Sequence, residues 1–430
     1  MRRSPPSTPA SATRREFLGS AGLVAGAAVA APYVITSTAL GTPTRPPASD
    51  RIVIGGIGLG NMGRADQGNF LKRPDVQYVA VCEVQEKAAD RGKADVDSRN
   101  GNRDCAVYRD FRDLLARADV DAVHIGTPDH WHAIMTIAAC VAGKDVYLQK
   151  PETLTLREGP LMVAAARRYG RVVSGGSQRV LGDYRFFTDP CWAGELGGIT
   201  SVDIEVGPPA QPCYLAAAPT PPGLDWDMWL GPAPWQPFNP GRISGGYGTT
   251  GDTWRSYVDY SGGALTDWGA HHFGGAIFAC DLREEQPVKV SWHPPSADGK
   301  AAAHASVTYR NGTQIFHARP ASLQPADGPL VLRQKAIVIA GDGRPSPPKP
   351  LPAYRGDGGI YGDFIHCVRT RERPFRDIEL AVNTMAAVHM IAIAHRLQRS
   401  LEWDRPSQRF VDDDEANRML DRARREPWIL

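Results

Sequence analysis

Three glycines near the first apolar run form a pattern that can hold a pyrophosphate. The segment Arg51–Gly63 reads R-I-V-I-G-G-I-G-L-G-N-M-G, so a β-branched strand gives way to glycines at G-x-G-x-x-G spacing. The first glycine permits a tight turn, the second lets the backbone approach the phosphates, and the third lets the next helix close onto the strand. Free N–H groups at that helix start then face the anion. The predicted contacts are Gly58, Gly60, Asn61, Met62 and Gly63.

An acidic residue ends the next apolar run. Val76–Glu83 reads V-Q-Y-V-A-V-C-E. Its glutamate lies about twenty residues beyond the glycines, where a carboxylate can hold both ribose hydroxyls of an adenosine. Because Glu83 would repel a 2′-phosphate, the pattern favours NAD over NADP, although Arg91 or Lys93 could still reach such a phosphate.

Three further side chains could move a proton and stabilise negative charge. Lys150 ends the run D-V-Y-L-Q-K before a proline, where a buried ammonium can stabilise charge developing on an alcohol or carbonyl oxygen. Asp267 and His271 are spaced i and i+4, so on a helix they share one face. Histidine suits a general base because its unperturbed pKa lies near neutrality. His272 is the substitute base, and without Lys150 and the glycine loop the pair would be an ordinary surface pair.

The histidines also allow a metal-site interpretation. His130 and His132, or the pair that starts at His271, could supply imidazoles to zinc, with Asp129 or Asp267 as carboxylate ligand. This would make the protein a hydrolase of another class. The glycine loop and the acid after the second strand would then have no task, so we favour a site without metal.

Two domains are expected to position these groups. Strands alternate with helices over 51–175, which predicts an α/β Rossmann domain with a doubly wound parallel sheet and ligands at the carboxyl ends of its strands. Over 176–430 the pattern predicts an α+β domain for substrate binding and oligomerisation, with an open, mostly antiparallel sheet. Asn311-Gly312 predicts a hairpin with a type I′ turn. The helices near the carboxyl end could pack back on the Rossmann domain.

The length, composition and net charge of the chain limit the kinds of partner that can be expected. With 430 residues and 42% hydrophobic residues it can bury a large core, while a net charge of +2 without a dense basic stretch gives no footprint for nucleic acid. Seven single cysteines show no C-x-x-C pair. The excursion 208–260 is rich in Trp and Tyr, whose flat faces suit either pyranose rings or a subunit interface, so it predicts a carbohydrate-binding surface or the interface of a dimer or tetramer.

Residues 1–50 are expected to be a signal and linker. Thr13–Leu18 reads T-R-R-E-F-L, which looks like a twin-arginine export signal, and Gly19–Ile35 suits a signal h-region better than a membrane span. Ala28–Ala30 offers a cleavage site, although a retained, membrane-tethered segment also fits. We therefore expect a periplasmic or otherwise exported protein. A bound nucleotide would then need to recover its redox state within the same active site.

Four motifs in this order resemble the Gfo/Idh/MocA oxidoreductase family, in particular its exported branch. They read G-I-G-L-G-N-M-G, G-T-P-D-H-W-H, D-V-Y-L-Q-K-P and G-G-A-L-T-D-W-G-A-H-H, and the resemblance covers Arg51–Leu430. It implies that Lys150 contacts the reacting oxygen, that His271 is the general base, and that Asp267 orients it or binds substrate. It also implies a set of residues around the cofactor, in which His132 is mainly a scaffold residue. These residues are Glu83, Thr127, Pro128, His132, Gln149, Lys150 and Gln178.

The resemblance implies hydride transfer, with NAD, from a secondary alcohol of a sugar, sugar derivative or glycoside. Whether the cycle ends as oxidation coupled to another reduction, or as transient oxidation that cleaves a glycosidic bond, stays open. Two departures from the family pattern, Gln149 in place of glutamate and Gly274 in place of aspartate, keep a third possibility open. That possibility is a carbohydrate-binding protein that has lost turnover.

Overall fold

The computed structural model describes residues 37–246, 253–334, 336–344 and 346–430. Contacts divide the chain into two units, Met1–Arg51 and Ile52–Leu430. In the first unit the described elements are the short helix α2 (Ser37–Leu40) and the 3₁₀ helix η1 (Ala48–Asp50). The predicted twin-arginine motif and h-region lie outside the described residues.

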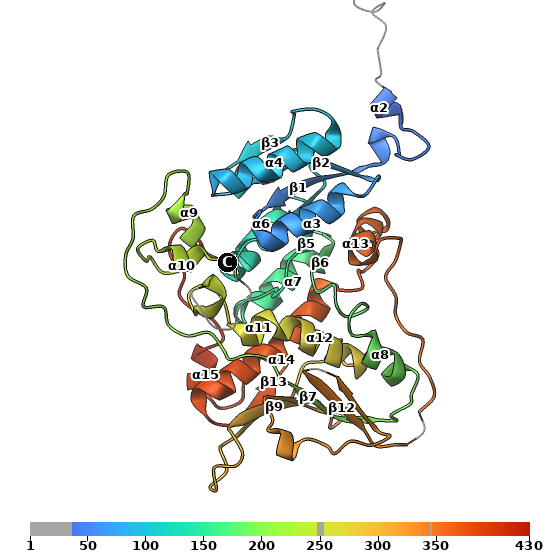
Figure 1. Cartoon of the computed structure of the whole chain (residues 1–430), viewed down its shortest axis with the longest axis vertical. Helices are drawn as coiled ribbons and strands as arrows, with labels where there is room; N and C mark the ends of the chain where they lie inside the picture. Colours follow the sequence, from blue (N-terminus) through green and yellow to red (C-terminus); the bar gives the residue numbers. More distant parts are fainter. Residues whose placement is uncertain (1–36, 247–252, 335, 345) are drawn as a thin grey trace, which may run out of the picture. The chain divides into compact units, whose positions relative to one another are not determined.

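A six-stranded parallel sheet begins the second unit, in the order β3-β2-β1-β4-β5-β6 (Figure 1). This confirms the predicted doubly wound fold. The strands are β1 (Ile52–Ile57), β2 (Val76–Cys82), β3 (Ala106–Tyr108), β4 (Ala122–Ile125), β5 (Asp145–Leu148) and β6 (Val173–Gly175). The helices between them are α3 (Asn61–Leu71), α4 (Glu86–Asn100), α5 (Phe111–Leu115), η2 (Asp129–Trp131), α6 (His132–Val141) and α7 (Glu158–Arg168).

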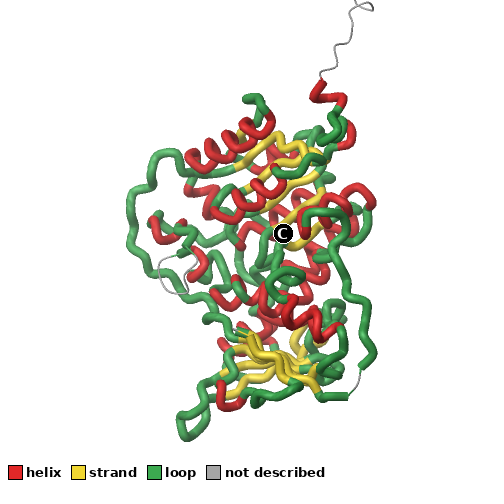
Figure 2. The backbone as a smooth tube through the Cα atoms, turned by 45° about the vertical axis from the view of Figure 1, so that its right-hand side comes forward, coloured by secondary structure: helices red, strands yellow, loops and turns green. Residues whose placement is uncertain are grey.

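An eight-stranded mixed sheet follows, and Figure 2 shows it as a second group of strands. Its order is β11-β12-β7-β10-β9-β8-β13-β14, and only β10 and β7 among these neighbours run parallel. The mostly antiparallel prediction is therefore confirmed. The strands are β7 (Ile199–Ile204), β8 (Lys289–His293), β9 (His304–Thr308), β10 (Gln314–His317), β11 (Val331–Gln334), β12 (Ile337–Gly341), β13 (Leu401–Asp404) and β14 (Arg409–Phe410).

The predicted type I′ turn between β9 and β10 is wrong. A type I′ turn needs positive φ at both central residues, but only Gly312 has one (φ 89°) and Asn311 does not. Asn311 instead accepts the Thr313 N–H through Oδ1 at 3.0 Å. A local side-chain hydrogen bond thus selects another turn for the same Asn-Gly pair.

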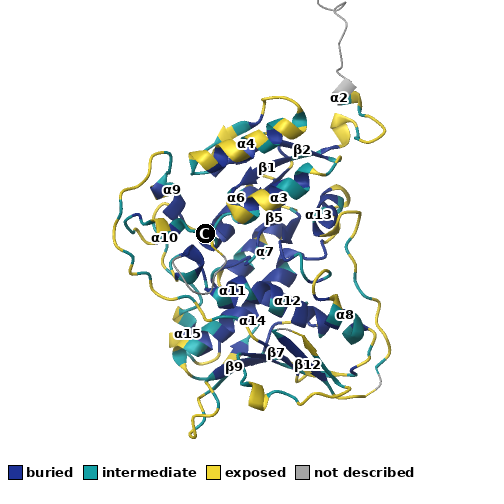
Figure 3. Ribbon diagram, viewed as in Figure 1, coloured by how far each residue is buried: buried dark blue, intermediate teal, exposed yellow. Residues whose placement is uncertain are grey.

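Helices of the carboxyl-terminal half fill the space between the sheets, and Figure 3 shows α12 and α14 almost entirely buried. Helices α8 (Arg185–Trp192), α12 (Gly269–Ala279) and α14 (Ile378–Leu397) share one core with the second sheet. Helix α13 (Gly359–Thr370) shares a core with β1, β2 and α3 of the first sheet. Among the described residues, α14 alone is long and apolar enough to cross a membrane, but 83% of its most apolar window is buried inside the protein.

The aromatic excursion forms a small core of its own. It contains α9 (Trp226–Leu230), α10 (Pro240–Ile243) and η3 (Trp254–Ser256), and α11 (Ala264–Asp267) follows it. Most of its described rings are buried and pack against one another, namely Trp226, Trp229, Phe238, Trp254, Tyr257 and Tyr260. Tyr214 and Trp235 are exposed instead, at 90% and 65%. Tyr247 lies outside the described residues.

The carboxyl-terminal tail docks on helices of the first domain. After the short helix α15 (Asp414–Arg418), the chain brings Trp428 to a T-shaped contact with Trp131, with ring centroids 4.7 Å apart. Trp428 is buried, and Arg112 lies over its ring at 5.1 Å. All seven cysteines are free thiols.

Candidate active site

A cavity of about 450 Å³ opens at the carboxyl ends of β1, β2, β4 and β5. This is where a doubly wound sheet places its ligand. Glycine-loop residues and Glu83 line one part of it, while Lys150 and Arg255 line another. The cavity therefore joins the predicted nucleotide loop to the predicted catalytic lysine.

The glycine loop has the geometry that a dinucleotide needs. Gly58 has φ +79°, which favours glycine, and a Cβ on Gly63 would lie 2.0 Å from the Gly58 carbonyl oxygen. A Cβ on Gly60 would meet no atom within 4 Å, so the space above that residue is open. Asn61 and Met62, which also line the cavity, begin α3 and present a helix start to this space.

Glu83 lines the cavity and also shapes the loop. Its Oε2 accepts the Leu59 N–H at 2.6 Å, and its Oε1 accepts the N–H groups of Val84 (2.8 Å) and Gln85 (3.0 Å). A carboxylate has about four acceptor positions, so about one is left for a ribose hydroxyl. Burial raises the pKa of Glu83, while these three bonds lower it.

The two basic residues that could have reached a 2′-phosphate are placed differently. Arg91 lines the cavity. Lys93 instead donates to the carbonyl oxygens of Arg103 and Cys105 and pairs with Asp97 at 2.8 Å. Of the two, only Arg91 remains available to the nucleotide site.

The loop after β4 divides into cavity lining and scaffold. Thr127 and Pro128 line the cavity, and the buried Thr127 Oγ1 has no hydrogen-bond partner among the described residues. His132 is fully buried, with Nε2 2.9 Å from the Thr127 carbonyl and Nδ1 2.7 Å from the Pro151 carbonyl. Burial lowers the pKa of His132 to about 4, so the neutral ring donates to only one of these carbonyls. Its placement is that of a scaffold residue.

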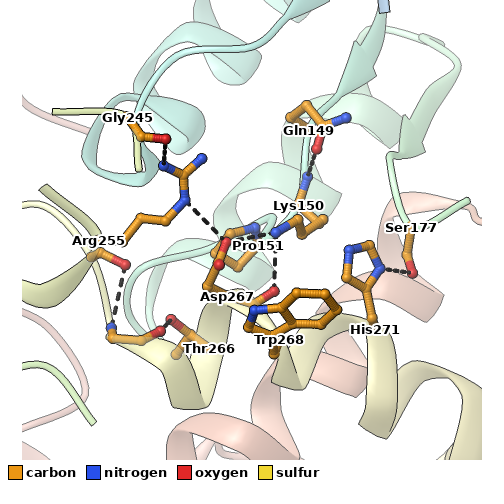
Figure 4. Close-up of polar contacts among 12 residues, drawn as sticks. Gln149, Lys150, Pro151, Ser177, Gly245, Arg255, Thr266, Asp267, Trp268 and His271 are labelled. Atoms are coloured by element: carbon orange, nitrogen blue, oxygen red, sulfur yellow. Dashed lines mark hydrogen bonds and ion pairs between the residues drawn. The ribbon is translucent and has the colours of Figure 1, made fainter. Parts of the chain in front are cut away.

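Lys150 is held at the end of β5 by one carboxylate (Figure 4). Its Nζ lies 2.6 Å from Asp267 Oδ1 and 3.1 Å from the Asp267 carbonyl oxygen, and the two side chains are only 8% and 7% exposed. Arg255 Nε lies 3.5 Å from the same Oδ1, and its guanidinium covers the Trp254 ring at 4.3 Å. One carboxylate thus orients two cations.

His271 lies one turn further along the chain and is kept neutral. Asp267 ends α11 and His271 lies in α12, so Trp268 joins two helices where the spacing predicts one. His271 Nδ1 is 2.9 Å from Ser177 Oγ (Figure 4). Burial lowers its pKa well below the ordinary value, and the nearby charge of Lys150 lowers it further. His272 instead places Nδ1 3.0 Å from the Trp268 carbonyl.

Two predicted residues need separate comment. Gln178 does not line the cavity, and its buried Oε1 has no hydrogen-bond partner among the described residues. At Gly274 a Cβ would lie 2.9 Å from Arg376 Nη1, and Arg376 pairs with Glu152 at 3.3 Å inside the protein. The glycine therefore leaves room for a buried ion pair.

The histidines of the metal interpretation are directed elsewhere. His130 Nε2 lies 3.0 Å from the Trp229 carbonyl, while His132 and His271 have the partners given above. Among residues 37–246, 253–334, 336–344 and 346–430, no group of three His, Cys, Asp or Glu side chains is placed to hold a metal ion.

Ser177 and Arg255 are site residues that the sequence interpretation missed. Ser177 follows the end of β6, and residues after the carboxyl end of a parallel strand are candidates in any doubly wound sheet. That rule could have identified it. Arg255 lies in the irregular aromatic excursion, where no spacing indicates its direction.

The fold and this site define an NAD-binding α/β oxidoreductase, and family comparison makes the class specific. Residues 52–177 match the Gfo/Idh/MocA model described as oxidoreductase family, NAD-binding Rossmann fold. Residues 212–430 match the oxidoreductase family, C-terminal alpha/beta domain. The chain therefore belongs to the Gfo/Idh/MocA oxidoreductase family, which confirms the predicted family and the predicted NAD cofactor.

Curated relatives include glycosyl hydrolase family 109 proteins from Shewanella. The protein of Shewanella sp. W3-18-1 is 30% identical over 169 residues, or 36% of this chain and 37% of the relative. That of Shewanella baltica OS185 is 31% identical over 170 residues, with the same coverage. The matched segment thus spans little more than a third of these relatives.

Solved structures share the fold at low identity. The WlbA dehydrogenase of Bordetella pertussis, in complex with NADH and UDP-GlcNAcA, is 17% identical with a TM-score of 0.56, covering 82% of this chain and 99% of that one. The aldose-aldose oxidoreductase of Caulobacter crescentus, complexed with glycerol, is 18% identical with a TM-score of 0.54 and the same coverage. At these identities the likeness describes the fold alone.

Proposed function

We propose that the protein oxidises a secondary alcohol of a sugar, sugar derivative or glycoside by hydride transfer to NAD, and that the retained nucleotide is reoxidised in place by reducing a second substrate. One observation carries the proposal. The ammonium of Lys150, 2.6 Å from Asp267, lines the same cavity as the glycine loop. A fixed cation at that point can stabilise an oxyanion while the hydrogen on the neighbouring carbon leaves.

The residues divide the work as follows. Bound NAD would supply the hydride acceptor, held by the glycine loop with Thr127 and Pro128. Lys150 would donate a hydrogen bond to the reacting oxygen, and Asp267 would hold the ammonium in place. If His271 donates Nδ1–H to Ser177, its Nε2 carries the lone pair that takes the hydroxyl proton. A low pKa keeps that nitrogen unprotonated at neutral pH.

Redox-neutral cleavage of a glycoside is the second candidate. The family 109 glycosyl hydrolases among the relatives favour it. Oxidation of a hydroxyl to a ketone acidifies the adjacent C–H, which permits elimination of the glycosidic oxygen. Addition of water and return of the same hydride then complete the cycle, so no external oxidant is consumed. This scheme suits a nucleotide that stays bound.

The two candidate reactions differ in which product accumulates, reduced nicotinamide or released aglycone. Purified protein should first be denatured and the released nucleotide identified by mass spectrometry. Intact protein is then mixed with a panel of sugars and aryl glycosides while reduced-nicotinamide absorbance and aglycone release are followed. A lasting absorbance rise indicates net oxidation, and aglycone release without it indicates the redox-neutral cycle. Neither signal with any compound, despite bound NAD, would favour a carbohydrate-binding protein without turnover.

Export is a separate part of the proposal and rests on residues 1–50 alone. A reporter fused to this segment should reach the periplasm when Arg14 and Arg15 are present and stay inside when both become lysine. A matched fusion with Arg2 and Arg3 changed to lysine should still be exported. Export of the Arg14→Lys/Arg15→Lys fusion would contradict the twin-arginine assignment.

A further inference from the structure

A buried carboxyl group lies behind the cavity, on the helix that begins at the glycine loop. Asp66, in α3, has no exposed surface. Its Oδ2 accepts a hydrogen bond from Gln149 Nε2 at 2.9 Å, and its Oδ1 accepts one from the Tyr361 hydroxyl at 2.7 Å. Burial raises the pKa of Asp66 to about 7, and these two bonds work against that rise.

The Gln149 amide joins this carboxyl group to the catalytic lysine. Its Nε2 donates to Asp66, and its Oε1 accepts the Lys150 backbone N–H at 3.1 Å. Turning the amide over would place an oxygen against the carboxylate and an NH₂ against the N–H, which removes both bonds. The orientation of Gln149 is therefore determined from both ends.

We infer that Asp66 is a positioning residue, which requires an amide at position 149 and through it fixes the backbone that carries Lys150. Glutamate at 149 would place a second carboxylate about 2.9 Å from the first, where both cannot stay ionised. Gln149, which departs from the glutamate of the family pattern, is then matched to Asp66: an amide at one position donates to a carboxylate at the other. The inference goes beyond the proposed function, because it holds whether or not a sugar is turned over.

Asp66 also connects three parts of the chain that the site needs. Helix α3 starts at the glycine loop, Gln149 directly follows β5, and Tyr361 comes from α13 in the carboxyl-terminal half. The Tyr361 ring stacks on Tyr147, with centroids 5.2 Å apart. One carboxyl group thus holds the helix after the nucleotide loop and the backbone before Lys150 in a fixed position relative to each other.

The titratable neighbours of Asp66 keep one charge state near neutrality. Tyr361 on α13, Tyr147 on β5 and Tyr78 on β2 all have a pKa raised above the ordinary tyrosine value by burial. His124 on β4 has its pKa lowered to about 4 by burial, so it is neutral. Between pH 6 and 8 the groups of this cluster that can change charge are therefore Asp66 and any carboxyl group introduced at position 149.

The test uses four variants of the whole protein, with NADH fluorescence for binding and thermal unfolding for stability. At pH 8, Gln149→Glu should weaken NADH binding about tenfold, and less at pH 6, where one carboxyl group is protonated. Asp66→Leu alone should weaken it about threefold, because it leaves the Gln149 N–H and the Tyr361 hydroxyl without their acceptor. The isosteric exchange Asp66→Asn/Gln149→Glu should return within about twofold of wild type, because an amide again donates to a carboxylate.

A matched control separates geometry from charge. Asp66→Leu/Gln149→Glu has the same net charge as wild type but no reciprocal hydrogen bond, and it should not recover NADH binding. Single variants that bind NADH like wild type, or an exchange no better than the leucine control, would overturn the inference. If Gln149→Glu does not fold, recovery of a cooperative unfolding transition in the exchange variant replaces the binding comparison. A wild-type protein that binds NADH but oxidises no sugar would contradict the proposed function and leave this test intact.

Discussion

The two walls of the cavity are built from different kinds of atoms. The nucleotide wall comes from the loop after β1 and the end of β2, and it offers mainly backbone: an open space over Gly60 and the start of α3, with Glu83 holding the Leu59 N–H. The opposite wall offers the side chains of Lys150 and Arg255, and distant segments hold them: Lys150 meets Asp267 across 117 positions, and behind this wall His271 meets Ser177 across 94. Backbone geometry follows from local sequence, whereas charge placement depends on the whole fold.

The largest expected effect concerns the side-chain wall. Lys150→Ala should lower kcat/KM by about 100- to 1,000-fold, because one preorganised donor to a developing oxyanion is lost. NADH affinity should change little, since the glycine loop is untouched. Lys150→Arg is the matched variant, and it should restore charge without restoring geometry. Full activity in Lys150→Ala would remove this lysine from the proposed mechanism.

A backbone change tests the nucleotide wall. Gly63→Ala would place a methyl group 2.0 Å from the Gly58 carbonyl, so the loop must open and NADH binding should weaken by about tenfold or more. Gly68→Ala, in the same helix, adds a methyl group with no atom within 4 Å. It should leave binding unchanged and raise the unfolding midpoint slightly, since alanine favours helix by about 1 kcal/mol. Titration of NADH fluorescence checks both, and equal binding by the two would contradict the assigned role of Gly63.

Acid should lower the free energy of unfolding, because buried neutral histidines take up protons when the chain unfolds. Burial lowers the pKa of His124 and His132 to about 4 and that of His130 to about 3, from an ordinary 6.5. Below pH 6.5 the unfolded chain therefore binds more protons than the folded one, so stability falls as pH falls. At pH 5 the cost is about 2 kcal/mol for each histidine.

Thermal unfolding between pH 8 and 5 measures this slope. His132→Gln keeps a hydrogen-bonding side chain but cannot take up the proton, so its midpoint should depend less on pH than that of wild type. A slope unchanged by this substitution would contradict the buried neutral state of His132.

The smallest expected effect is at Arg255. Its guanidinium is 3.5 Å from the Asp267 carboxylate that already holds Lys150, so it supports the lysine indirectly. Arg255→Lys should lower kcat/KM by about three- to tenfold with NADH affinity unchanged. Arg242→Lys, in the same excursion, is a control without contact to Asp267, because that guanidinium contacts the Tyr260 hydroxyl at 3.2 Å. A loss in Arg242→Lys equal to that in Arg255→Lys would indicate general damage to the excursion.

The local sequence pattern was sufficient to predict much of the fold. The first strand and the glycines after it, the acid that ends β2, and the alternation of strand with helix follow from short-range preferences. The prediction was wrong at the Asn311-Gly312 turn, where a side chain competes with the backbone. It was also incomplete between Asp267 and His271, where two helices meet at Trp268.

The sequence by itself determined the family, the doubly wound sheet, the NAD loop and the position of Lys150 at a strand end, because these depend on neighbours within a few residues. Only the tertiary structure decided that Asp267 carries both cations, that Ser177 faces His271, and that Asp66 stands behind Gln149. Such pairs form when burial removes water from charged groups and leaves each one dependent on partners that the chain supplies from far away.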